Sequence, residues 1–440
     1  MMKKNRNKIL KYVLTPLVMV LFYSAPHVTG AEKVIQKLEI KALPEKKDSL
    51  YAVGEEFRFE IKAHGVAFPA KLYYSLARPD GNNINKTIKD FRGQISIPCV
   101  MKKPGFALLS VTLTDAAGKT VRARYGAGAE PEKIRFPDSR PGDFESFWKK
   151  NAEECLKGPF KVKQFPCDDK PGSKVVCHGF EINDFKGGPV TGYIAIPNVA
   201  KKKSLSAIAF FHGAGVRDAH RDIVEGIAKQ YNVICMDVGA HGLPLAKGKD
   251  YYTNLLNTSL KNYQYTGKED RTKSYFFNMF RRDLRAMGYL MSLPEWNGKK
   301  LVVCGGSQGG GQVLFIAAMV PQVTLVNASV PALCGHNGYA AGYRNGWPQW
   351  VDRKDYNKKG SPAAIAASYF DMVNFAPMIK AKAVFTVGLI DPVCPADSVY
   401  AAYNMLGGND KIIFNGPQMS HATTPEISKG IWRIIKEHIK

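Results

Sequence analysis

The chain has 440 residues, of which 45% are hydrophobic, so it is long and apolar enough to bury a large core and is not a disordered or fibrous protein. Its formal charge is +24, from 62 lysines and arginines against 38 acidic residues. The basic residues are scattered, and no basic helix carries interleaved aromatics, so we expect a solvated basic surface and no nucleic-acid partner, with weak attraction to an acidic polysaccharide as the alternative.

The first 30 residues have the pattern of a secretory leader. Five basic residues precede an apolar run over residues 12–25, which is too short to span a bilayer comfortably. Val28, Thr29 and Gly30 are small or modest residues at a plausible cleavage site. We therefore predict a signal peptide over residues 1–30 and an exported bacterial protein, periplasmic or extracellular, without a membrane span after cleavage. The alternative is an uncleaved membrane anchor.

Eight cysteines in an exported protein raise the question of disulfides. Cys167 and Cys177 flank a turn, and Cys334 and Cys394 each follow a late strand, so either pair is a candidate disulfide. The remaining spacing does not resemble a metal site. Two cysteines in apolar strand runs read as buried thiols, namely Cys235 and Cys304.

Residues 33–126 consist of short runs in which polar and apolar side chains alternate, separated by turn residues. This pattern predicts a small immunoglobulin-like β-sandwich. Nothing in it suggests catalysis, so the sandwich either binds carbohydrate or packs against the next domain, and we favour the second reading. A proline-bearing connector is expected over residues 127–141, followed by a catalytic domain over residues 142–440.

The catalytic domain begins with an amphipathic helix that Asp143 is expected to cap. From about residue 160 onward, continuous apolar runs alternate with helical patterns, which predicts an α/β fold with a mostly parallel sheet covered on both faces. The expected strands are residues 192–197, 206–211, 231–237, 301–304, 323–328, 383–389 and 411–414.

A glycine-rich turn at residues 305–311 separates one of these strands from a helix. Gly305, Ser307 and Gly309 fill the G-x-S-x-G pattern of a nucleophile elbow. The turn holds the serine clear of its neighbours, and the following helix directs its first N–H groups at developing negative charge. The pattern predicts Ser307 as a nucleophile, and an ordinary glycine-rich loop is the alternative.

The partners of this serine are expected after later strands, in the order serine, acid, histidine. Asp391 ends one late strand, and His421 follows the last strand 30 residues further on. Asp397 is the competing acid, ranked second because it is placed to cap a helix. Backbone N–H groups of Gln308 and Ala214 are expected to bind the oxyanion, without any metal or other cofactor.

Three further residues are candidates for substrate binding because they follow sheet strands near the predicted site: His241, His336 and Trp347. Aromatic side chains beside an active site stack on sugar rings, but packing of a lid explains them equally well. For His241, stabilisation of a loop is an equally good reading. His212 is expected to shape the oxyanion loop rather than to take part in the chemistry.

These residues belong to stretches that resemble the acetyl xylan esterase and cephalosporin C deacetylase family, carbohydrate esterase family seven. The resemblance spans residues 140–440 and rests on residues 143–148, 282–286, 293–295, 305–310, 388–391, 394–395, 401–404 and 420–421. It implies an α/β-hydrolase fold with Ser307, Asp391 and His421 as nucleophile, acid and base. The implied activity is removal of acetyl groups from plant polysaccharides or related sugars.

Three positions depart from the family pattern. Gly239-Ala240-His241 replaces an R-G-Q motif, Ala422 replaces the glutamate after the catalytic histidine, and Ala214 stands in place of a tyrosine after H-G. These departures bear on pocket shape, acyl preference and the family's ring-like homo-oligomer. Our first hypothesis is an exported serine esterase acting on acetylated carbohydrate. The alternatives are an esterase or peptidase with another acyl or leaving group, and a carbohydrate-binding protein with a vestigial triad.

Overall fold

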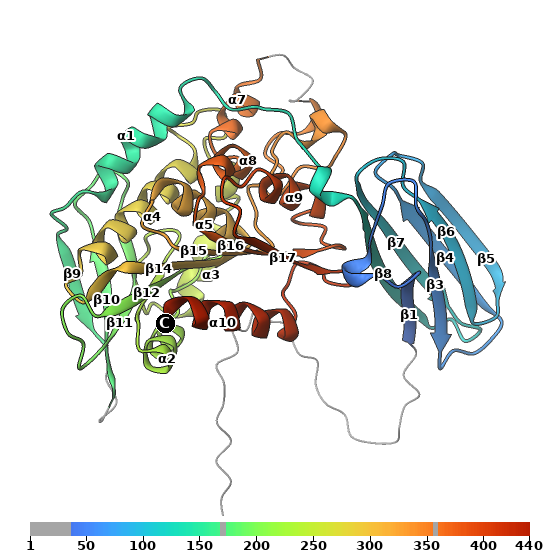
Figure 1. Cartoon of the computed structure of the whole chain (residues 1–440), viewed down its shortest axis with the longest axis horizontal. Coiled ribbons are helices and arrows are strands. Elements are labelled where there is room, and N and C mark those ends of the chain that lie inside the picture. The colour runs from blue at the N-terminus through green and yellow to red at the C-terminus, as the bar shows by residue number, and fades with distance from the viewer. Residues whose placement is uncertain (1–36, 168–172, 355–359) are drawn as a thin grey trace, which may run out of the picture.

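The computed structural model describes residues 37–167, 173–354 and 360–440 (Figure 1). The predicted signal peptide, residues 1–30, lies outside this part of the chain. Within it, no helix combines the length and the apolar character that crossing a bilayer requires. The described chain forms mostly antiparallel β-sheets at its N-terminal end and a larger α/β body after them.

The N-terminal sheets have three and five strands, in the orders β1-β3-β6 and β2-β8-β7-β4-β5. Alternate side chains of both sheets point into one apolar core, which explains the polar–apolar alternation of the sequence. The strands are β1 (Lys37–Leu43), β2 (Leu50–Tyr51), β3 (Glu56–His64), β4 (Ala70–Ala77), β5 (Ile84–Phe91), β6 (Gln94–Val100), β7 (Gly105–Thr114) and β8 (Thr120–Ala129).

The connector predicted over residues 127–141 begins too early. Residues 127–129 continue β8, because Ala127 and Ala129 still pair with β7 and are fully buried. A short 3-10 turn, Pro131–Lys133, follows directly. The small side chains of this stretch read as connector in the sequence, but tertiary pairing extends the strand.

The α/β body is built on a nine-stranded sheet in the order β17-β16-β15-β14-β12-β13-β11-β10-β9. The six strands from β17 to β13 in this order are parallel, and β11, β10 and β9 add an antiparallel edge. The strands are β9 (Val162–Pro166), β10 (Val175–Ile182), β11 (Val190–Pro197), β12 (Leu205–Phe211), β13 (Ile234–Val238), β14 (Trp296–Gly306), β15 (Leu325–Ser329), β16 (Lys382–Gly388) and β17 (Lys411–Gly416).

Helices cover both faces of this sheet, as Figure 1 shows, with α2 and α10 on one face and α1, α4, α5, α8 and α9 on the other. Leu301 and Val303 of β14 point to one core, and Val302 points to the other. This explains the continuous apolar strand runs. The helices are α1 (Phe144–Leu156), α2 (Arg221–Tyr231), α3 (Lys249–Asn257), α4 (Tyr275–Ser292), α5 (Gln308–Met319), α7 (Pro362–Ser368), α8 (Met372–Phe375), α9 (Ala396–Asn404) and α10 (Pro425–Ile439).

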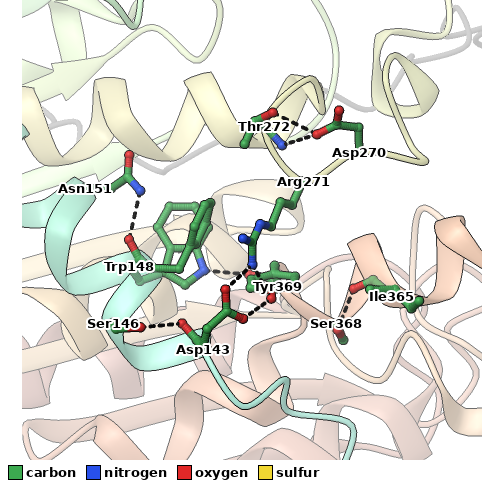
Figure 2. Close-up of polar contacts among 11 residues, drawn as sticks. Asp143, Ser146, Trp148, Asn151, Asp270, Arg271, Thr272, Ile365, Ser368 and Tyr369 are labelled. Carbon is green, nitrogen blue, oxygen red and sulfur yellow. Dashed lines mark hydrogen bonds and ion pairs between the residues drawn. The ribbon is translucent and has the colours of Figure 1, made fainter.

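Asp143 precedes α1, but its side chain does not cap the helix as predicted. The carboxylate instead accepts hydrogen bonds from Arg271, at 2.6 Å, and from the Tyr369 hydroxyl, and these bonds lower the pKa of Asp143 (Figure 2). Trp148 of α1 donates from Nε1 to the Tyr369 carbonyl at 2.8 Å. The start of α1 is thereby joined to the segment before α4 and to the end of α7.

All eight cysteines lie among the described residues, and all are free thiols. Cys167, directly after β9, is a close neighbour of Cys177 on β10, with the Cys167 N–H donating to the Cys177 carbonyl at 3.3 Å, but no bond joins their sulfurs. Cys334 and Cys394 are both buried and also unbonded. Neither candidate disulfide is present in this structure.

The sandwich packs against the β17 edge of the larger sheet (Figure 1). The Gly126 N–H of β8 donates to the Pro417 carbonyl at 2.8 Å, and Gln418 donates from Nε2 to the Ile40 carbonyl at 3.2 Å. Phe106 of β7 lies 5.4 Å from Tyr400 of α9, measured between ring centroids. The sandwich therefore contacts the segments that follow β16 and β17.

Candidate active site

Ser307 occupies the sharp turn between β14 and α5, with φ 56° and ψ −121°. This backbone conformation is rare for a residue with a side chain, and it is the strained geometry expected of a nucleophile elbow. The flanking glycines are sterically required. A Cβ at Gly305 would lie 2.2 Å from the Gly309 carbonyl oxygen, and one at Gly309 would lie 2.1 Å from that of Phe211.

The structure brings Ser307, His421 and Asp391 together at the carboxyl edge of the sheet. His421 Nε2 lies 2.8 Å from Ser307 Oγ, and His421 Nδ1 lies 2.7 Å from Asp391 Oδ2. Since the Asp391 carboxylate accepts, His421 carries its proton on Nδ1 and accepts the Ser307 hydroxyl proton on Nε2. The His421 side chain is 25% exposed, so a substrate can reach it, whereas the Asp391 side chain is fully buried.

Asp391 is fixed by two further hydrogen bonds. Its Oδ1 accepts from the Val393 N–H at 2.8 Å and from the Cys394 N–H at 3.0 Å, which leaves Oδ2 directed at His421. The competing acid, Asp397, lies in the first turn of α9, and within the described residues its Oδ1 has no hydrogen-bond partner. Burial raises the pKa of Asp397 to about 6. The histidine is thus paired with Asp391 and not with Asp397.

The two backbone groups predicted to bind an oxyanion lie beside Ser307. Gln308 is the first residue of α5, and a Cβ built on Gly213, next to Ala214, would lie 3.7 Å from the Ser307 Cβ. Among residues 37–167, 173–354 and 360–440, neither the Ala214 N–H nor the Gln308 N–H donates to a protein acceptor. Both donors are therefore free to bind a negatively charged oxygen.

His241 does not face a substrate with a free nitrogen, contrary to its prediction as a binding residue. Its Nε2 lies 3.0 Å from the Gly215 carbonyl oxygen, and its Nδ1 lies 2.7 Å from the Tyr275 hydroxyl. Burial lowers the pKa of His241 to about 4, so the ring is neutral near pH 7. The histidine instead stabilises the oxyanion loop, which was the alternative reading of this residue.

The prediction for His336 is also wrong. Its side chain lies in the interior beside Trp350, with ring centroids 5.7 Å apart, and the residue is only 1% exposed. Burial lowers the pKa of His336. Trp347 is half-buried, and its backbone links the loops after β15 and β16 through hydrogen bonds with Leu333 and Val393. Its role in substrate binding stays a prediction.

A second histidine–aspartate cluster lies behind the oxyanion loop. His212 Nε2 is hydrogen-bonded to Asp237 Oδ1, and His220 Nδ1 lies 3.4 Å from Asp237 Oδ2. Burial alone would raise the pKa of Asp237, but the two rings outweigh it and hold the pKa below its ordinary value. One ring nitrogen of each histidine and a carboxylate oxygen of Asp237 lie within 4.8 Å of one another, and the spacing of these residues along the chain did not reveal this cluster. Two of these three atoms could bind a metal ion only if the hydrogen bond between His212 and Asp237 were broken.

Tyr263 is a residue of this site that the sequence did not single out. Its hydroxyl donates to the Gln308 side-chain oxygen Oε1 at 2.7 Å and accepts from the Gly215 N–H at 3.2 Å. It lies in a single 3-10 turn, Tyr263–Tyr265, between α3 and α4. A short turn without helical or strand periodicity gives no sequence signal for such a contact.

Comparisons with known proteins identify relatives that hydrolyse esters. Residues 130–430 match the acetyl xylan esterase (AXE1) family. The chain is also similar to acetyl esterase Axe7A of Xylanibacter ruminicola, with 27% identity over 405 residues and 90% of each chain covered. Because 90% of this chain is longer than the part that follows β8, this match extends into the N-terminal sheets.

Two solved structures show the same fold. An acetyl xylan esterase from Paenibacillus sp. R4 has a TM-score of 0.59 and 21% identity, covering 70% of this chain and 98% of its own. Acetyl xylan esterase 1 from Thermoanaerobacterium sp. JW/SL YS485 has a TM-score of 0.60 and 19% identity, covering 71% of this chain and 98% of its own. Both leave out nearly a third of this chain.

Proposed function

Since the chain belongs to the acetyl xylan esterase family and is therefore a carboxylic ester hydrolase, we propose that it removes acetyl groups from polysaccharide or sugar esters with Ser307 as its nucleophile. The observation that carries the proposal is the hydrogen-bonded series from Ser307 through His421 to Asp391. Its order along the chain and its place at the carboxyl edge of the sheet fit an α/β-hydrolase triad.

In the first half of the reaction, the Ser307 oxygen attacks the acetyl carbonyl carbon while His421 Nε2 takes the hydroxyl proton. Asp391 holds the imidazole in the required tautomer and stabilises the imidazolium that forms. The carbonyl oxygen becomes an oxyanion, which accepts hydrogen bonds from the Ala214 and Gln308 N–H groups. The carbon–oxygen bond to the sugar then breaks, and His421 gives its proton to the departing sugar oxygen, which leaves as a hydroxyl group.

In the second half, the acetyl group is bound to Ser307 as an ester, and water replaces the sugar. His421 takes a proton from this water, whose oxygen attacks the acetyl carbon, and the same two N–H groups stabilise the second oxyanion. The bond to Ser307 breaks, the serine regains its proton from His421, and the product leaves as acetic acid, which ionises to acetate. The α5 N-terminus adds a favourable dipole at both oxyanions.

The proposal extends to place and substrate. We propose export to the periplasm or outside the cell, on the sequence pattern of residues 1–30. An acetylated carbohydrate is favoured as substrate because the similar proteins are acetyl and acetyl xylan esterases. A different acyl or leaving group is the second candidate, since Ala214 and His241 depart from the family pattern beside the oxyanion loop.

The test is acetate release from a panel of acetylated glycans, including acetylated xylan, by the wild type and by Ser307→Ala. We expect release that the substitution abolishes. A series of p-nitrophenyl esters from acetate to longer acids separates an acetylesterase from an enzyme with another acyl preference. A folded wild type that neither releases acetate nor reacts with a fluorophosphonate probe would instead support a carbohydrate-binding protein with a vestigial triad.

A further inference from the structure

The peptide groups of Gly215 are held from two sides. The Gly215 N–H donates to the Tyr263 hydroxyl at 3.2 Å, and the Gly215 carbonyl oxygen lies 3.0 Å from His241 Nε2. Gly215 has φ 113°, which glycine adopts without strain, and Arg217 Nη2 also donates to the Ala214 carbonyl, so the loop is held by hydrogen bonds to its backbone. The preceding residue is Ala214, whose N–H is one of the two donors expected to bind the oxyanion.

The protons of this network have one consistent arrangement. Tyr263 has a single hydroxyl proton and donates it to Gln308 Oε1, so its oxygen is free to accept from Gly215. The Gly215 carbonyl can only accept, so the neutral His241 ring must donate from Nε2, and its Nδ1 then accepts from the Tyr275 hydroxyl, whose oxygen also lies 3.1 Å from the Ala240 carbonyl oxygen. The neutral His241 ring therefore carries its proton on Nε2 and donates it to the Gly215 carbonyl.

We propose that Tyr263 is a positioning residue for the oxyanion hole, because its hydroxyl ties the Ala214–Gly215 loop to the side chain of Gln308. The two donors expected to bind the oxyanion belong to segments almost 100 residues apart in sequence, and the Tyr263 oxygen bridges them directly. Fixing both segments before the substrate arrives makes their N–H groups converge on one point. This inference rests on the proposed esterase function.

The surroundings of Tyr263 make it suitable for a single-atom test. The residue is 4% exposed, and its ring centroid lies 4.7 Å from that of His241 and 4.5 Å from that of Tyr275. Tyr263→Phe keeps this ring packing and removes only the bridging oxygen. The Gly215 N–H and Gln308 Oε1 each lose a partner, and Gly215 then keeps only the contact of its carbonyl with His241.

The experiment compares kcat and KM of the wild type and Tyr263→Phe for p-nitrophenyl acetate. Loss of an oxyanion donor lowers kcat on the order of 100–1000-fold, and a donor that is only misplaced retains part of its effect. We expect kcat to fall about 10–100-fold while KM changes less than about threefold. Tyr265→Phe is the matched control, because Tyr265 lies in the same turn and donates instead to the Pro348 carbonyl.

Two measurements separate positioning from a loss of structure. Complete labelling by a fluorophosphonate counts active sites, so Tyr263→Phe should reach the wild-type extent at a slower rate. Gln308→Met removes the other end of the bridge and keeps the backbone N–H. The double variant should then be little slower than the slower single variant, since both act through one interaction.

The inference is overturned if Tyr263→Phe retains kcat within about twofold of the wild type, or if its loss only reflects fewer labelled sites. Additive effects of the two substitutions also contradict it. If the wild type hydrolyses no ester, or if its hydrolysis persists in Ser307→Ala, the proposed function is overturned together with this inference.

Discussion

Gly126 provides a direct test of whether the sandwich holds the catalytic loops in place. A Cβ at this position would lie 2.4 Å from the Leu389 Cβ and 2.8 Å from the Leu389 carbonyl oxygen. Carbon atoms pack at about 3.5–4.0 Å, so Gly126→Ala requires the two segments to separate by about 1 Å. Leu389 precedes Asp391 by two residues, so this shift arises beside the predicted acid.

The shift reaches the histidine as well. The Leu389 N–H donates to the Gly416 carbonyl at 3.0 Å, and the Ile390 N–H donates to the Met419 carbonyl at 3.3 Å, so the loops carrying Asp391 and His421 move together. A misplacement of about 1 Å in a catalytic group reduces the rate by as much as about 100-fold. We therefore expect Gly126→Ala to lower kcat/KM about 10–100-fold and to destabilise the protein by about 1–3 kcal/mol through overpacking.

The assay is hydrolysis of p-nitrophenyl acetate, with thermal unfolding measured on the same samples. Gly93→Ala is the control, because Gly93 has φ 104°, which a side chain disfavours, and a Cβ there would approach the Phe68 ring, at 3.2 Å, within the sandwich. It should lower the melting temperature with a much smaller effect on kcat/KM. Equal kcat/KM for Gly126→Ala and the wild type would refute the reasoning, as would equal losses of kcat/KM in both variants.

Three further predictions concern groups away from the sandwich. Burial raises the pKa of Asp283 to about 8, so between about pH 4 and 8 the folded chain holds a proton that the unfolded chain releases, and stability falls as pH rises through this window. Asp283→Asn keeps a hydrogen-bonding partner for Gln312 but carries no titrating proton. Its melting temperature minus that of the wild type should therefore be several degrees larger at pH 8 than at pH 5, and an equal difference at both pH values would contradict this. Asp391→Ala should lower kcat about 10,000-fold in an ester assay, whereas Asp397→Asn should keep kcat within a few-fold of the wild-type value. The opposite result would identify Asp397 as the acid of the triad. Arg271→Ala removes a partly exposed ion pair and two ring contacts, so thermal unfolding should show a loss of about 1 kcal/mol with kcat intact, and a large fall in kcat would contradict a purely structural role.

The sequence was most informative where local pattern and topology coincide. The elbow around Ser307 needs glycines because of close backbone contacts, and such a requirement is visible in sequence. The positions of Asp391 and His421 after late strands were informative because the carboxyl ends of parallel strands lie at the same edge of a sheet. Within the described part of residues 33–126, which begins at Lys37, the polar–apolar alternation likewise predicted which faces are buried, as did the apolar runs of the larger sheet.

The errors share a physical cause, because a side chain's partners depend on the tertiary fold. Asp143 precedes a helix and has a capping residue type, but Arg271 and Tyr369, more than 100 residues away in sequence, compete for its carboxylate. His241 and His336 follow strands as predicted, but their direction depends on packing. His241 turns toward Gly215, and His336 turns into the interior.

Two of the positions that depart from the family pattern, Ala214 and His241, lie in or beside the oxyanion loop. By the resemblance in sequence, His241 replaces the glutamine of an R-G-Q motif and Ala214 replaces a tyrosine. In this structure the His241 ring donates to the Gly215 carbonyl, and the Tyr263 hydroxyl accepts from the Gly215 N–H. If these contacts fix the loop together, replacing His241 by glutamine should be tolerated only while the Tyr263 hydroxyl remains. The sandwich contacts the loops that carry the acid and the histidine, and Tyr263 contacts the oxyanion loop, so each half of the predicted machinery has contacts with a segment outside the triad motifs.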